Sequence, residues 1–100
     1  MDIEKIICAA IWYDDGVNRS NLPHNINSGI VASGWRHHNC YTILWALYPN
    51  RDYLDHTVQG FLTSKGNFVD RRGASLIAIE AGQIPMFPRT SGELYSEDLY

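Results

Sequence analysis

The sequence lacks most of the features that announce a function. Its 100 residues include only two cysteines, Cys8 and Cys40, which favours reduced thiols in a cytosolic protein over a disulfide scaffold. The formal net charge is −3, so there is no general basic surface for nucleic-acid polymers. No apolar run approaches the roughly 18 residues of a membrane span, and the N-terminus carries no charged-then-apolar leader. We therefore expect a cytoplasmic protein without nucleic-acid polymer or membrane partners.

Catalytic and metal motifs are equally scarce. No Gly-x-Ser-x-Gly, Walker or dinucleotide glycine motif occurs. His37 and Cys40 have a His-x-x-Cys spacing, but no second pair accompanies them. Asp14 and Asp15 could offer a general base or Mg²⁺ ligands, yet adjacent residues of a strand point to opposite faces. The sequence therefore predicts no metal, no cofactor and no obvious catalytic machinery.

The hydrophobic pattern predicts strands within a single domain, residues 1–100. Residues 5–13 are apolar on both alternating faces, which is typical of a central strand covered on two sides. Residues 14–16 are expected to end it, residues 17–28 to form a loop or loose hairpin arm, and residues 29–33 a second strand. Residues 57–63 alternate between two faces, and residues 64–67 supply a turn before a further extended pair.

Two helices are predicted from apolar residues at i, i+3, i+4 and i+7. The first starts at Arg36 and ends before Pro49. The second follows Asp70 as N-cap and ends at Gly82 in a left-handed conformation. Residues 50–56 could add one helical turn. We expect an α/β fold of the α+β type, a small mixed or antiparallel sheet of about four strands with two main helices.

The end of the chain, residues 85–100, is polar, acidic and too short to fold alone. It is expected to pack on its own domain or on a second copy. Its apolar residues have no helix or strand pattern that would bury them internally, which favours a homo-oligomer. These residues are Met86, Phe87, Leu94, Tyr95, Leu99 and Tyr100.

The first candidate site is the start of the first predicted helix, within residues 34–39 (GWRHHN). Unpaired backbone N–H groups and the helix dipole favour an anion there. Arg36 adds a fork suited to phosphate, and His37 and His38 add hydrogen-bond donors. The same residues would also suit an ordinary helix start, with a structural arginine and one histidine satisfied by a neighbour.

The second candidate site is the start of the second predicted helix, where Arg71 and Arg72 follow Asp70. Phe61 shares the polar face of its predicted strand with Gln59, where its ring could stack on a base or ribose edge while an arginine holds a phosphate. A core position for Phe61 is the alternative. Two helix starts that each carry arginine indicate a ligand with more than one phosphate.

These motifs resemble those of the small phage-encoded Thoeris anti-defence sponges, which sequester cyclic ADP-ribose signals made by bacterial TIR-domain proteins. Five stretches carry the resemblance, and the asparagine-rich residues 17–28 are interpreted as an insertion. The stretches are GWRHHN (34–39), QGF (59–61), GNFVDR (66–71), AGQI (81–84) and SEDLY (96–100).

The resemblance implies a binding protein rather than an enzyme, a homodimer or homohexamer with pockets between subunits in the host bacterial cytoplasm. It also implies a separate site for the cyclic di- or trinucleotide signals of CBASS. Arg89 is assigned to phosphate contact at an oligomer interface. Asp70, an acid where a phosphate pocket prefers a neutral group, would suit a ribose hydroxyl or an adenine amino group. The ligand-binding candidates are Arg36, His37, His38, Phe61, Asn67, Asp70, Arg71 and Arg89.

We therefore expect a sponge that binds cyclic ADP-ribose-type nucleotides, glycocyclic isomers included, without degrading them. One alternative is a small nucleotide-phosphate hydrolase that uses His37 or His38 as acid or base. The other alternative is a homo-oligomeric protein-interaction module.

Overall fold

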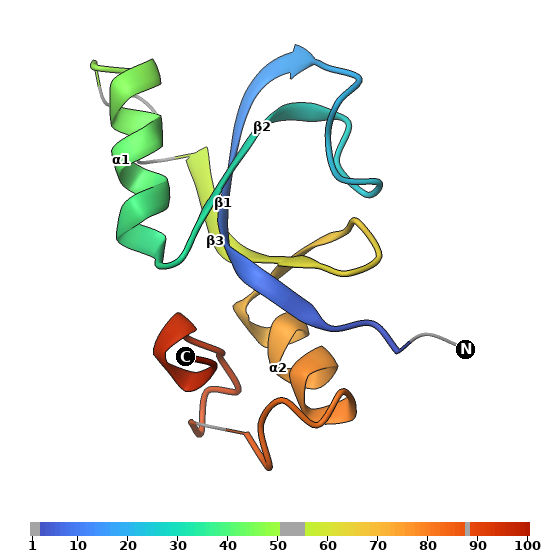
Figure 1. The fold of residues 1–100 in the computed structure, drawn as a ribbon. Helices are drawn as coiled ribbons and strands as arrows, with labels where there is room; N and C mark the ends of the chain where they lie inside the picture. The colour runs from blue at the N-terminus through green and yellow to red at the C-terminus, as the bar shows by residue number, and fades with distance from the viewer. Residues whose placement is uncertain (1–2, 51–55, 88) are drawn as a thin grey trace.

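In the described part of the chain, four strands form one antiparallel sheet in the order β2-β1-β3-β4 (Figure 1). The computed structural model describes residues 3–50, 56–87 and 89–100. The elements are β1 (Ile6–Asn18), β2 (Ser28–Gly34), α1 (His37–Leu47), β3 (Thr57–Thr63), β4 (Phe68–Asp70), α2 (Arg71–Glu80) and the 3₁₀ helix η2 (Ser96–Asp98). The expected α+β fold with four strands and two main helices is confirmed. Among the described residues, no helix is long and apolar enough to cross a membrane.

Strand β1 is central, as predicted, but it is longer than predicted. Residues 14–16 do not end it, because β1 continues to Asn18, which pairs with Ser28 of β2. The register shifts between Tyr13 and Asn18, so the polar residues are accommodated at an irregularity of the hairpin. The loop is therefore shorter than residues 17–28. In this loop Asn25 binds both backbone groups of Phe68, which ties it to β4.

A second irregularity, near the start of β1, changes which of its side chains point towards the core. The register with β3 shifts between Ile6 and Cys8. Ile6 consequently joins the buried residues around Ala9, while Ile7 is 55% exposed. The predicted cover on both sides of this strand was therefore wrong at Ile7, because a one-residue shift moves side chains to the other face.

One face of the sheet carries both helices and the C-terminal residues, and the main core lies there. Strand pairing places Phe61 opposite Ala9 and Gln59 opposite Ile11, so all four share that face. Phe61 is fully buried. Its predicted ligand-facing position was wrong, because the polar face of β3 is the one that the helices cover. The core on this face includes Ala9, Ile11, Cys40, Leu44, Phe61, Ala74, Ala78 and Leu94.

The helix ends follow the predicted local signals. Arg36 is the N-cap of α1, where its backbone N–H donates to Oδ1 of Asn39 at 3.0 Å, and α1 gives way to Tyr48 before Pro49. Asp70 caps α2 by accepting from the N–H of Gly73 at 2.8 Å. Gly82 follows with a φ of 75°, as expected of a left-handed residue. The helical turn predicted at residues 50–56 falls almost entirely on residues 51–55, outside the described residues.

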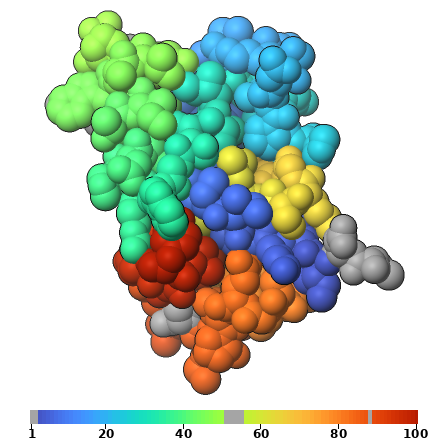
Figure 2. All heavy atoms as spheres, viewed as in Figure 1, coloured from blue at the N-terminus to red at the C-terminus, as the bar shows by residue number. Residues whose placement is uncertain are grey.

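The C-terminal residues pack on their own domain, one of the two expected arrangements. Figures 1 and 2 show them between the start of α1 and α2. Leu94 is fully buried, and its N–H donates to the carbonyl of Arg71 at 2.9 Å. The expectation that no residue of this segment is buried internally was therefore wrong for Leu94. Met86 and Phe87 remain 70% and 51% exposed.

Candidate ligand-binding site

Two adjoining cavities lie where the helices begin, and Arg71 and Tyr95 line both. The larger has a volume of about 690 Å³ and lies against β3 and the start of α2. The smaller, about 360 Å³, lies against the start of α1 and the C-terminal residues. Together they bring five of the predicted candidates to one place, namely Arg36, His37, His38, Asp70 and Arg71.

Arg71 is the central cation of the site. Its two terminal nitrogens donate to the carbonyl of Leu94 at 2.8 Å and to Oε1 of Gln59 at 2.5 Å. Gln59 in turn donates through Nε2 to the hydroxyl of Tyr41 at 2.9 Å, which links β3 to α1. The guanidinium also lies 4.4 Å from the ring centre of Tyr95. It is thus held in place while other N–H donors remain for a bound anion.

Arg36 lines the smaller cavity and contacts residues 96–100. Its guanidinium donates to Oγ of Ser96 at 3.2 Å and to the backbone oxygen of Tyr100. The carboxylate of Glu97 lies 3.9 Å away. The phosphate-binding fork predicted from the sequence is therefore occupied by groups of the protein itself.

The two histidines differ sharply in their surroundings. His37 is buried, and its Nε2 donates to the carbonyl of Gly60 at 2.8 Å. Its ring meets the ring of Phe61 edge-on at 5.1 Å between centres. Burial lowers the pKa of His37, and the positive charge of Arg71 acts in the same direction. His37 is therefore the satisfied structural histidine of the alternative interpretation, while His38 is exposed.

The remaining candidates fall outside the cavity lining. Phe61 lies beneath His37 in the core. Asn67 belongs to the β3–β4 turn, where its side chain donates to Glu4 at 3.1 Å. Arg89 lies beside the site, ion-paired with Asp98 at 2.5 Å, and its guanidinium is 3.8 Å from the ring centre of Tyr95.

Sequence reasoning named Tyr95 only among the apolar residues of the tail and not as a site residue, yet with Arg71 it lines both cavities. It belongs to no predicted element, and it precedes the SEDLY stretch by one position. Its place depends on the docking of Leu94, its neighbour in the chain, into the core. Leu94 is one of several apolar residues in a segment rich in polar ones, and the sequence does not show which of them docks in the core.

The ionised side chains that line the cavities balance each other. Three arginines, Arg36, Arg71 and Arg72, face three carboxylates, Asp70, Glu93 and Glu97. Arginine forks suit phosphate, and carboxylates suit hydroxyl or amino groups. The arrangement can therefore hold a ligand that carries phosphate groups together with hydroxyl or amino groups, as nucleotides do.

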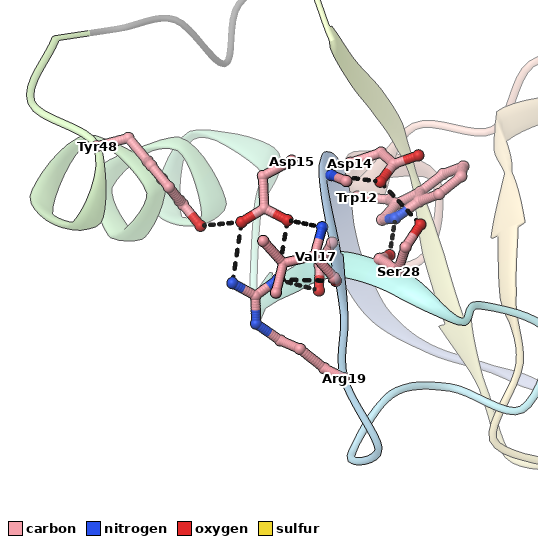
Figure 3. Close-up of polar contacts among 9 residues, drawn as sticks. Trp12, Asp14, Asp15, Val17, Arg19, Ser28 and Tyr48 are labelled. Carbon is pink, nitrogen blue, oxygen red and sulfur yellow. Dashed lines mark hydrogen bonds and ion pairs between the residues drawn. The ribbon is translucent and has the colours of Figure 1, made fainter.

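The paired carboxylates Asp14 and Asp15 have separate partners (Figure 3). Asp14 accepts from the hydroxyl of Ser28 at 2.8 Å. Asp15 accepts from Arg19 at 2.9 Å and from the hydroxyl of Tyr48 at 3.2 Å. The hydrogen bond from Arg19 holds the pKa of Asp15 well below its usual range. The expected opposite orientation of the two carboxylates is confirmed.

Cysteine and metal chemistry find little support in the described part of the chain. Cys8 and Cys40 are both free, as predicted. Burial raises the pKa of Cys40 to about 11, which leaves it as an unreactive thiol at neutral pH. Within residues 3–50, 56–87 and 89–100, no three His, Cys, Asp or Glu side chains are grouped so that they could hold a metal ion.

Comparison with known proteins gives one family. A family model described as Phage T4 y16D protein matches residues 5–100. No curated protein and no solved structure matches the chain.

Proposed function

We propose that this chain, which belongs to the Phage T4 y16D protein family, binds and sequesters a signalling nucleotide of the cyclic ADP-ribose type without degrading it. In this role it would act as an anti-defence sponge in the host bacterium. The observation that carries the proposal is the convergence of two predicted helix starts, from separate stretches of the sequence, on two adjoining cavities. They bring Arg36, His38, Asp70 and Arg71 to the cavity lining, while the buried His37 is bonded to the carbonyl of Gly60.

The geometry supports binding more than catalysis. Arg71 is held by Gln59 and Leu94 at the junction of the cavities, where it can meet a phosphate without further ordering. The carboxylate of Asp70 lines the larger cavity, where it can accept from a ribose hydroxyl or an amino group. His37, one of the two histidines considered for acid–base chemistry, already donates to the carbonyl of Gly60. The hydrolase alternative therefore depends on His38, which is exposed at the smaller cavity.

The test is to incubate the purified protein with cyclic ADP-ribose isomers, remove unbound nucleotide, denature the protein by heat and identify what is released. We expect intact nucleotide from the wild-type protein. The Arg71→Ala variant should release much less, because a charge-assisted phosphate contact is lost. Arg19→Ala is the matched control, since Arg19 is an arginine paired with Asp15 outside both cavities.

Other outcomes would support the alternative functions. Release of a hydrolysed nucleotide would contradict the sponge and favour the hydrolase. No retention of any nucleotide by the wild-type protein would favour the protein-interaction module.

A further inference from the structure

We propose that the last residues of the chain regulate this site by competing with an anion for Arg36. We call residues 95–100 the C-terminal strap. The inference rests on the proposed function, because it concerns how the same site becomes available to its ligand. In this arrangement the strap covers Arg36 in the unliganded protein, and an anion gains Arg36 when the strap is released.

The strap contacts three arginines: the ring of Tyr95 lies against Arg71 and Arg89, Asp98 is ion-paired with Arg89, and three further groups meet Arg36. Within the strap, Ser96 offers its hydroxyl and Tyr100 its backbone oxygen to the guanidinium, and Glu97 offers a carboxylate at 3.9 Å. All three groups are oxygen acceptors, the type of partner that a phosphate supplies. A phosphate at Arg36 would therefore compete with the strap for the same N–H donors.

The strap has a defined point at which it can detach. Leu94, the residue before it, is fully buried and bonded to the backbone of Arg71, and thus stays docked on the core. Beyond this residue the side chain of Glu97 is 62% exposed, whereas Ser96 is buried and Leu99 packs against the core. Release of residues 95–100 consequently uncovers the part of the core around Leu99, while Leu94 stays docked.

Tyr100 fastens the strap to the residues that precede α1. Its hydroxyl donates to the carbonyl of Trp35 at 2.6 Å, and the two rings meet edge-on at 4.9 Å between centres. The guanidinium of Arg36 lies 5.0 Å from the centre of the Tyr100 ring. Replacing Tyr100 should therefore loosen the strap more than replacing any other exposed residue in it.

The negative charge of Glu97 also opposes the binding of an anion in the smaller cavity. Its carboxylate lines the smaller cavity together with Arg36 and Arg71. While the strap is closed, this charge neutralises part of the positive field that an anion would experience. Release removes both the competing acceptor and the negative charge from the cavity.

The cover on Arg36 can be measured without any ligand, by modification with phenylglyoxal and peptide mapping by mass spectrometry. Arg72, an exposed arginine of the same chain, serves as the internal reference. We expect the rate at Arg36 relative to Arg72 to rise about fivefold in Tyr100→Ala, because local opening becomes more frequent. Equal relative rates in wild-type and variant would overturn the strap as a cover.

The competition is measured with inorganic pyrophosphate as probe, by titration calorimetry. Glu97→Gln should bind pyrophosphate about threefold more tightly than wild-type, the size expected for removing one exposed charge. Glu80→Gln is the control, because Glu80 is an exposed carboxylate of α2 that lines neither cavity. Unchanged or weaker binding in Glu97→Gln would show that the strap is not a competitor.

The two measurements, arginine modification and pyrophosphate binding, distinguish a failure of the strap proposal from a failure of the proposed function. If no protein retains pyrophosphate or nucleotide, the proposed function fails and competition fails with it. The modification of Arg36 then still decides whether the strap covers it. Similar thermal unfolding midpoints among the variants show that each change acts on the strap and not on the core.

Discussion

Two arginine-centred regions of the molecule differ in what holds the guanidinium. At the end of α1, Arg19 forms a two-pronged pair with one carboxylate, Asp15, four residues away in the chain. At the cavities, Arg71 is held by neutral oxygens from Gln59 and Leu94. The first arginine has its charge matched at short range, whereas the second has neutral hydrogen-bond partners.

This difference separates a structural arginine from a ligand-binding candidate. A guanidinium that already meets a carboxylate gains little from a second anion, because its charge is compensated. A guanidinium fixed by neutral acceptors keeps its net charge and loses little freedom when an anion arrives. The local partner, more than the arginine itself, therefore decides which region can bind phosphate.

The largest expected effect comes from the core beneath the cavity region. Phe61→Ala should lower the free energy of unfolding by about 3 to 5 kcal/mol, because it leaves a cavity under His37 and α1. Urea unfolding followed by circular dichroism measures the loss. Ile7→Ala is the control, since this exposed side chain should cost little. A nearly unchanged midpoint for Phe61→Ala would return Phe61 to a ligand-facing role.

The next effect tests the comparison directly through binding. Arg71→Ala should weaken nucleotide affinity by about 1.5 to 3 kcal/mol, roughly ten- to a hundredfold, because a charge-assisted contact is lost. Arg19→Ala should leave the affinity unchanged, since its charge is already paired with Asp15. Titration calorimetry with cyclic ADP-ribose isomers gives both values. Equal losses of nucleotide affinity in the two variants would contradict the distinction between the two regions.

A smaller effect is expected at the paired arginine, and it should depend on acidity. Asp15→Asn should cost about 1 kcal/mol of stability at pH 7, because it removes an ion pair and weakens the bond to Tyr48. The pKa of Asp15 is lowered in the folded state, so this contribution is fully present above about pH 4 and is lost as the pH falls further.

Urea unfolding of wild-type and Asp15→Asn at pH 7 and pH 3 measures this dependence. The difference between the two proteins should be smaller at pH 3, where the carboxyl begins to be protonated in the unfolded chain. A difference of equal size at both pH values would show that the pair contributes through packing and not through charge.

The smallest expected effect is a pH dependence at the cavities. Burial lowers the pKa of His37 in the folded protein, so below about pH 6.5 the unfolded chain binds a proton that the folded chain does not. Stability should therefore decline as the pH falls from about 6.5. His37→Asn should flatten this part of the profile in urea unfolding between pH 7 and pH 5. An identical slope in both proteins would mean that His37 does not contribute.

The sequence by itself determined the elements that depend on nearby residues. A continuous apolar run predicted β1, a short apolar stretch predicted β2, alternation predicted β3, and the i, i+3, i+4, i+7 pattern predicted both helices. Asp70 and Gly82 marked the limits of α2, because a cap and a left-handed glycine act on backbone groups within one turn. The placement of two arginines near helix starts was predicted for the same reason.

Tertiary structure alone decided which side of each element faces the core and what each arginine contacts. Alternation in β3 defines two faces, but it does not tell which of them the helices cover, so Phe61 was placed on the wrong side. Arg36 contacts Ser96 and Tyr100, at the other end of the sequence. Such contacts depend on how distant segments pack, which local sequence patterns do not encode, and they decide which guanidinium groups remain available to a ligand.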